Sequence, residues 1–323
     1  MRIVSIGEAL IDFIPNKKGC ALKDVSGFTR ACGGAPANCA AAAAKLGAET
    51  ALISCVGNDS FGEFITETLS SVGIDTSYIV HTDKANTTLA FVSLKADGNR
   101  DFSFYRNPGA DMLLNENDIT DEALADCGIL HFGSVDLIEA PVKYAHKKAI
   151  SIAKKNNAII SFDPNIRLPL WDSPESCLKS VRSFMPLADV VKISDDELAF
   201  ITGIENEEKA IESLFEQGAK LILYSLGAKG ARLITKKHDV YCPSIDVEVA
   251  DTTGAGDSCM GSLLFCLAKD EINPQTLNLL SPEKLLEYLR FSVAYSTCSV
   301  MNKGAISSYV SYNDTIKFIS ERM

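Results

Sequence analysis

Short apolar segments rich in β-branched residues recur along this chain and alternate with stretches of helical spacing. The strand-like segments cover residues 2–7, 49–57, 127–134, 157–165, 189–194 and 219–227, and helices are expected near 35–46, 60–72, 141–155, 173–184 and 206–217. This alternation is typical of a mostly parallel sheet with helices on both faces. Strands buried on both faces are nearly continuous apolar runs, as IISF and LILYS are. The sequence therefore predicts an α/β fold.

One region interrupts the alternation with a pair of strand-like runs. Residues 86–107 hold two such runs joined by Asp97-Gly98, a dipeptide that favours a tight hairpin turn. Together with extended segments near 10–34, this hairpin is expected to form a small sheet that stands off the main one as a lid. The chain has no linker rich in Pro, Gly or Ser and no internal repeat, so we expect a single domain over residues 1–323.

The composition restricts the partners and the compartment. The 323 residues carry a net charge of −11, which disfavours nucleic acid and anionic membranes as main partners. No apolar run reaches the ~18 residues of a membrane span, and the acidic Glu8 and Asp12 favour a first strand over a signal peptide. The ten cysteines form no Cys-x-x-Cys pair and the four histidines lie far apart. We therefore expect buried thiols, no zinc site and a cytoplasmic location.

The segment DTTGAGDS at residues 251–258 combines glycines with a carboxylate. Apolar residues at helical spacing follow it, so Gly254, Ala255 and Gly256 are expected at a strand-to-helix corner, with Asp257 in the first helical turn. Free N–H groups and the positive end of the helix dipole would make this corner an anion site. A carboxylate there could deprotonate an alcohol that attacks a bound phosphate. The alternative is an acidic cap on a buried helix.

A second segment, GGAPANCAAAAAKLG, predicts a short alanine-rich helix over 35–46. Asn38 is the side chain of this packed wall that can hydrogen-bond, and Gly33-Gly34 leaves the backbone open beside it. This combination suits a ligand with many hydroxyl groups. A tightly packed helix with a satisfied Asn38 is an equally good interpretation of this segment alone.

Polar residues also follow several of the predicted strands. Asp163, Asn165 and Arg167 come after one strand, and Lys192, Ser194 and Glu197 lie at the end of the next. Ligands of open α/β sheets bind along the carboxyl edge of the strands, so these groups are expected at one site. The turn containing Gly227 and Gly230 is explained better by a simple hairpin than by a ligand when it is taken alone. The chain has no P-loop, dinucleotide-binding or G-x-S-x-G pattern.

Taken together, these segments resemble the ribokinase (PfkB-type) carbohydrate kinases over essentially the whole chain. DTTGAGD is the most specific segment and GGAPAN the second, while DPNIRLPLWDS and KISDDEL are similar to the fructokinases of that family. The resemblance implies a ribokinase-like three-layer αβα sandwich with a mostly parallel central sheet and a small β-sheet lid. It also implies ATP-dependent phosphorylation of D-fructose to D-fructose 6-phosphate.

The same resemblance implies roles for individual residues. Asp257 would be the base, and the backbone of Gly254, Ala255 and Gly256 would form an anion hole for the transferring phosphate. The residues expected to bind the sugar are Asp12, Gly33, Gly34, Asn38, Arg106 from the lid hairpin, and Arg167.

The cofactors implied are ATP and Mg2+, with K+ activation as a further expectation. Glu197 would act on Mg2+ through water, although Ser194 stands where the family has an asparagine. The nucleotide would contact Ser225, Gly227, Gly230 and Asn302. The loop for K+ would contain Asp251, Thr253, Gly304 and Ser308.

Two alternatives to a fructose kinase stay open. The first is a kinase of the same family that acts on 2-keto-3-deoxygluconate, another sugar or a nucleoside, since Arg106 and Tyr105 could receive an acid. The second is a non-catalytic sugar-binding regulatory protein, which the intact Asp257 corner disfavours. Exposed edges of the lid sheet would allow a homodimer.

Overall fold

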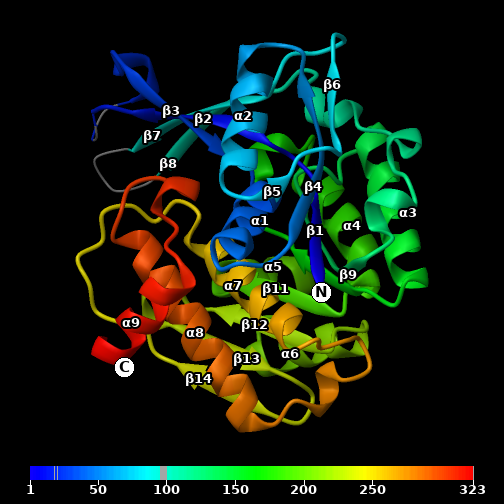
Figure 1. Cartoon of the computed structure of the whole chain (residues 1–323), viewed down its shortest axis with the longest axis vertical. Coiled ribbons are helices and arrows are strands. Elements are labelled where there is room, and N and C mark those ends of the chain that lie inside the picture. The colour runs from blue at the N-terminus through cyan, green and yellow to red at the C-terminus, as the bar shows by residue number, and fades with distance from the viewer. Residues whose placement is uncertain (18, 20, 95–99, 323) are drawn as a thin grey trace.

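The computed structural model describes residues 1–17, 19, 21–94 and 100–322, and its centre is a large sheet (Figure 1). The strand order is β14-β13-β12-β11-β10-β9-β1-β4-β5, with β6 paired to β4. Pairing is parallel from β12 through β5, and β13 and β14 are antiparallel. The strands are β1 (Arg2–Ile6), β4 (Thr50–Gly57), β5 (Ile74–Asp75), β6 (Ile79–Thr82), β9 (Cys127–Gly133), β10 (Ile159–Asp163), β11 (Val190–Ser194), β12 (Leu221–Ser225), β13 (Ala231–Ile234) and β14 (Asp239–Cys242).

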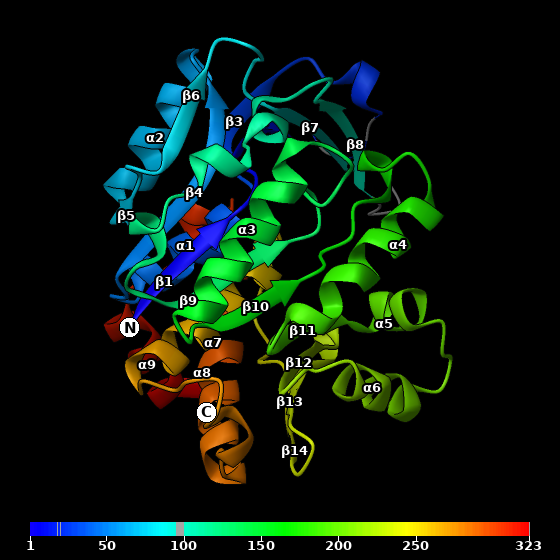
Figure 2. The ribbon, with the colours of Figure 1, turned by 90° about the vertical axis from the view of Figure 1, so that its right-hand side faces the viewer.

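Helices cover both faces of this sheet (Figure 2). In β1, Ile3 packs into the hydrophobic core on one face and Val4 into the core on the other, which explains the continuous apolar runs in the strands. The predicted α/β fold with a mostly parallel sheet is confirmed. One face carries α1 (Ala35–Lys45), α2 (Ser60–Ser71), α7 (Ala255–Lys269), α8 (Pro282–Val300) and α9 (Tyr312–Arg322), and the other carries α3 (Pro141–Lys155), α4 (Pro174–Phe184), α5 (Asp195–Thr202) and α6 (Glu207–Glu216).

The small sheet predicted from the sequence is present and has the strand order β3-β2-β7-β8. We call these strands the lid sheet; they are β2 (Leu10–Pro15), β3 (Phe28–Gly33), β7 (Leu89–Leu94) and β8 (Arg100–Tyr105), at the upper left of Figure 1. The Phe13 and Phe91 rings stack with centroids 4.7 Å apart, and Phe28 packs edge-on against both. The predicted Asp97-Gly98 turn lies outside the described residues.

The alanine-rich helix α1 follows its sequence signals closely. It begins after Gly34, has Pro36 in its first turn, and is followed by Gly47 at φ 100°. Its small side chains allow α7 to approach: a Cβ built on Gly261 would lie 2.5 Å from the Cys39 carbonyl oxygen. The close crossing of α1 and α7 brings Asn38 and Asp257 together.

The segment before α7 differs from the prediction. The sequence placed Gly254 after a strand, but the last strand ends at Cys242, and residues 243–254 are neither strand nor helix. The backbone N–H groups of Ala250 and Asp251 both donate to the Val300 carbonyl oxygen. This loop is therefore held by the end of α8 and not by a sheet, so the predicted strand-to-helix corner is wrong and Asp251 does not end a strand.

Within the described part of the chain, no helix has the length and apolar character needed to cross a membrane. The nine cysteines that the structure describes are free and buried. His131 and His146 are buried as well, and burial lowers the pKa of His131 to about 3 and that of His146 to about 4. Both rings are therefore neutral near pH 7.

Candidate active site

A cavity of about 470 Å³ lies between the lid sheet and the carboxyl ends of the main-sheet strands. Its walls come from segments far apart in the sequence: strand β2, the start of α1, the loop after β10, and the start of α7. Nine of the predicted site residues line it: Asp12, Gly34, Asn38, Arg167, Asp251, Thr253, Gly254, Asp257 and Gly304.

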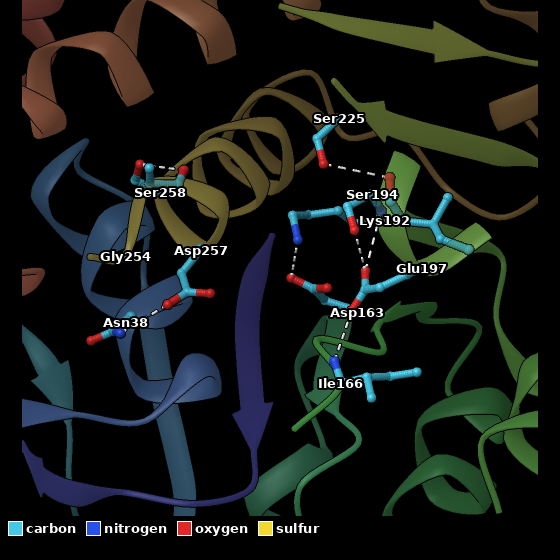
Figure 3. Close-up of polar contacts among 12 residues, drawn as sticks. Asn38, Asp163, Ile166, Lys192, Ser194, Glu197, Ser225, Gly254, Asp257 and Ser258 are labelled. Atoms are coloured by element: carbon cyan, nitrogen blue, oxygen red, sulfur yellow. Dashed lines mark hydrogen bonds and ion pairs between the residues drawn. The ribbon is translucent and has the colours of Figure 1, made fainter. Parts of the chain in front are cut away.

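Asp257 lies in the first turn of α7 and its carboxylate is held by α1. The Asn38 amide nitrogen donates a 2.8 Å hydrogen bond to Asp257 Oδ2, and Figure 3 shows the two side chains pointing at each other. Burial and the nearby Asp163 carboxylate raise the pKa of Asp257, while the Asn38 hydrogen bond, Lys192 and Arg167 act in the opposite direction. The result is an oriented carboxyl group with increased proton affinity, as a general base requires.

Gly254 sits at the N-cap of α7 with φ 73°, a left-handed conformation that favours glycine. A Cβ at this position would lie 2.6 Å from both Ala305 Cβ and Tyr309 Oη. The Tyr309 hydroxyl also donates to the Gly254 carbonyl oxygen at 3.1 Å. The backbone at the start of α7 is thus fixed by Ala305 and Tyr309. The first N–H groups of a helix are the ones that an anion can bind.

Two glycines allow close approaches at the wall formed by β2 and α1, one to an acidic side chain and one to the backbone. A Cβ on Gly33 would be 2.1 Å from Asp12 Oδ2, so the Asp12 carboxylate lies against the Gly33 backbone. Gly34 has φ 107°, and a Cβ there would be 2.2 Å from the Glu8 carbonyl oxygen. Glu8 Oε1 accepts a 2.9 Å hydrogen bond from Ala35 N, and burial raises the pKa of Glu8 to about 7.

Arg106 is placed differently from the other residues that were predicted to bind the sugar. It follows β8 of the lid sheet, and its side chain is 3% exposed and forms ion pairs with Asp111 and Asp136. It borders a separate cavity of about 480 Å³ instead of the one that contains Asp257. Despite burial, Asp111 and Asp136 raise the pKa of Arg106, while burial and the Asp111 charge raise that of Asp136.

Polar residues at the ends of β10 and β11 form an ion pair and a group of hydrogen bonds around one carboxylate. The Lys192 ammonium nitrogen is 2.7 Å from Asp163 Oδ2 in a buried ion pair. Glu197 Oε1 accepts a 2.7 Å hydrogen bond from Ile166 N, and Oε2 accepts hydrogen bonds from Ser194 N and Oγ (Figure 3). Each Glu197 oxygen is a hard acceptor oriented by the backbone, which fits a role in binding water around Mg2+.

The predicted nucleotide-binding residues lie apart from the cavity of Asp257. Ser225 ends β12 directly opposite Ser194, and Gly227 and Gly230 form the turn between β12 and the antiparallel β13. Both glycines have positive φ, and a Cβ on Gly230 would lie 2.2 Å from the Cys242 carbonyl oxygen. The geometry is that of a tight hairpin, the simpler of the two sequence interpretations. Asn302 follows α8, next to the Gly304 loop.

Asp251 joins the two loops expected to bind K+. Its Oδ1 accepts hydrogen bonds from Thr253 N at 3.0 Å and Thr253 Oγ at 2.7 Å, and its Oδ2 accepts one from Gly304 N at 3.0 Å. The Ser308 hydroxyl donates to the Ala305 carbonyl oxygen. In residues 1–17, 19, 21–94 and 100–322, no group of three or more His, Cys, Asp or Glu could hold a metal ion.

Comparison with known proteins decides the family. The pfkB family of carbohydrate kinases matches residues 1–311. The chain belongs to this family. The ribokinase-like resemblance stated from the sequence is therefore confirmed.

Several proteins that are similar to this chain are fructokinases. The chain is 41% identical over 322 residues to probable fructokinase-5 of Arabidopsis thaliana, covering 99% of this chain and 98% of the relative. The crystal structure of fructokinase with bound ATP from Xylella fastidiosa has a TM-score of 0.92 and 32% identity, covering 99% of this chain and 98% of the other. A fructokinase double mutant from Vibrio cholerae in a fructose, ADP and potassium ion bound form has a TM-score of 0.87 and 30% identity, covering 98% of each chain.

Sequence reasoning missed two acidic residues of this pfkB kinase that lie at or beside the cavity. Glu8 follows β1 and lines the cavity, and Asp136 follows β9 and pairs with Arg106. Both come shortly after a parallel strand, as Asn165 and Arg167 do after β10. The same rule about polar strand ends would have identified them if it had been applied to every predicted strand.

Proposed function

We propose that this protein transfers the γ-phosphate of ATP to D-fructose, giving D-fructose 6-phosphate and ADP. The observation that carries the proposal is the Asp257 carboxylate in the cavity wall, held by Asn38 and adjoining the glycine corner at the start of α7. Fructokinases are similar to this chain over nearly its full length. The assignment corresponds to an ATP:D-fructose 6-phosphotransferase.

In this proposal, the sugar occupies the cavity and Asp257 accepts the proton of its reacting hydroxyl group. The hydroxyl oxygen bonds to the γ-phosphorus, the bond to the β,γ-bridging oxygen breaks, and ADP leaves. The N–H groups of Gly254, Ala255 and Gly256 stabilise the negative charge on the transferring group. Asp12, Gly34, Asn38 and Arg167, which line the cavity, would hold the sugar, with Gly33 behind Asp12.

Magnesium would reach the site with ATP and neutralise phosphate charge, which suits a protein of net charge −11. Glu197 would orient its water ligands, and Ser225, Gly227, Gly230 and Asn302 would contact the nucleotide. K+ would bind at Asp251, Thr253, Gly304 and Ser308. A fructokinase that resembles this chain has been seen in a potassium ion bound form.

An acid substrate such as 2-keto-3-deoxygluconate is supported less well than fructose. The residues that could receive its carboxylate were Arg106 and Tyr105. Asp111 and Asp136 neutralise the Arg106 charge, and Tyr105 is 65% exposed. The closing of Arg106 over a neutral sugar stays a prediction. It would require the ion pairs of Arg106 with Asp111 and Asp136 to rearrange.

We place the enzyme in the cytoplasm, because the free and buried cysteines suit a reducing compartment. A homodimer through the lid sheet is also proposed, since β3 and β8 are its edge strands. Analytical ultracentrifugation, compared with a variant carrying charged residues on an edge strand, tests the dimer.

A panel of sugars tests the substrate assignment. With ATP and Mg2+ at saturation, kcat/KM is measured for fructose, glucose, ribose, 2-keto-3-deoxygluconate and adenosine. Fructose should give the highest value. A higher value for the sugar acid or the nucleoside would refute the substrate assignment while leaving the kinase fold unaffected.

A further inference from the structure

A buried ion pair lies directly beneath the proposed anion hole. Lys192 on β11 and Asp163 at the end of β10 are 6% and 2% exposed, and Lys192 Nζ is 2.7 Å from Asp163 Oδ2 (Figure 3). Neither residue lines the cavity that contains Asp257. Neither is therefore placed to contact a sugar in that cavity, and both act on the site from behind it.

The pair is in contact with the backbone that carries the base. A Cβ built on Gly256 would lie 3.2 Å from both Cε and Nζ of Lys192, so the ammonium group packs against the residue before Asp257. Opposite charges at this depth act through a medium that screens them weakly. The charged or titratable groups that face Asp257 from the surrounding elements are Cys39 on α1, Asp163, Arg167, Lys192 and Tyr309, with the Asn38 amide also bound to it.

We propose that Lys192 and Asp163 form a positioning pair for the base: the two opposed charges beneath Gly256 set the proton affinity of Asp257. The inference rests on the proposed function, in which Asp257 is the base. The Asp163 carboxylate favours the protonated form of Asp257 and the Lys192 ammonium favours the ionised form. Because Asp163 also neutralises Lys192, the pair supplies this balance without leaving an unpaired charge in the core.

The variants are chosen so that each step removes one charge; without Asp163, the Glu197 and Asp257 carboxylates still favour the charged form of Lys192. Lys192→Met alone would leave Asp163 as an unpaired buried carboxylate, which would take up a proton and obscure the result. Asp163→Asn removes the anion, and adding Lys192→Met to it removes the cation in a background that has no orphaned carboxylate. The comparison of these two variants isolates the Lys192 charge.

The measured quantity is the pH of the acid limb of kcat/KM for fructose. In Asp163→Asn this limb should move to lower pH by about 1 unit, and in the double variant it should return toward higher pH. Glu8→Gln is the matched control, because Glu8 lines the same cavity and also titrates. If the acid limb moves in Glu8→Gln as much as in Asp163→Asn, the titrating group is Glu8 and the proposal is overturned.

A second measurement does not depend on turnover. The 13C carboxyl resonance of Asp257, assigned by its loss in Asp257→Asn, is titrated in each variant. The proposal expects its midpoint to fall in Asp163→Asn and to rise again in the double variant. Unchanged midpoints, or shifts of the same sign in both steps, would overturn it. Full activity of Asp257→Asn would instead refute the part of the proposed function that makes Asp257 the base, whatever the titrations show.

Discussion

Replacing Gly261 by alanine tests whether the close crossing of α1 and α7 holds the Asn38 amide against the Asp257 carboxylate. Asn38 precedes Cys39 on α1, and Asp257 lies one turn before Gly261 on α7. The crossing point and the hydrogen bond are therefore adjacent. A methyl group inserted at the crossing should act on the bond without touching either of its partners.

The size of the effect follows from the packing. The new Cβ would lie 2.5 Å from the Cys39 carbonyl oxygen and 2.7 Å from Ala42 Cβ, whereas ordinary contact begins at 3.4 Å. The helices must then separate by about 1 Å, because backbone and a methyl group cannot move aside as a flexible side chain would. The 2.8 Å bond from Asn38 to Asp257 would stretch beyond hydrogen-bonding distance. A misplacement of this size costs on the order of 100-fold in rate.

Steady-state kinetics and thermal unfolding check this prediction. In Gly261→Ala, kcat should fall by about 10–100-fold. Overpacking should lower the free energy of unfolding by about 1–3 kcal/mol. The better helix propensity of alanine should restore about 1 kcal/mol of it. Ser262→Ala, which removes an atom from the next residue of α7, is the control and should keep most of the activity. A Gly261→Ala enzyme with wild-type kcat would refute the idea that the crossing positions the base.

Three further predictions concern other parts of the site. Arg106→Met leaves Asp111 and Asp136 buried without their cation, so the free energy of unfolding in urea should fall by about 3–5 kcal/mol; an unchanged midpoint would contradict this. Glu8 has a folded-state pKa of about 7, above its ordinary value of 4.5, so stability should decrease as the pH rises from 4.5 to 7, by up to about 3 kcal/mol. Thermal scans across that range should show a smaller decrease for Glu8→Gln, and parallel curves would refute the assignment. Gly254→Ala should lower kcat by at least about 10-fold, because φ 73° and the contacts with Ala305 and Tyr309 exclude a side chain; wild-type turnover would contradict this.

Features with a local cause could be predicted from the sequence. Helix α1 is marked by Pro36 and Gly47, and Asp257 falls in the first turn of α7 because the apolar spacing that follows it is helical. The strands were predicted because burial on both faces leaves long apolar runs. Each of these signals lies within a few residues of the feature that it predicts.

Features that depend on distant partners could not be predicted. The bond between Asn38 and Asp257 joins residues 219 apart, and no local pattern encodes it. Arg106 was expected over the sugar, but its charge is held by Asp136, 30 residues away, after a strand whose polar end was not considered. The segment before Gly254 has the composition of a strand but lacks a neighbouring strand, because its N–H groups bond to the end of α8.

The activity of Asp257→Asn tests the central claim most directly. The wild type and the variant are assayed for ATP-dependent formation of fructose 6-phosphate by 31P NMR, and calorimetry measures fructose binding to both. Our account predicts that kcat falls by about 10²–10⁴-fold while fructose affinity changes little, since the amide keeps the shape of the carboxylate and loses its basicity. A variant that retains wild-type kcat would contradict the assignment of Asp257 as the base.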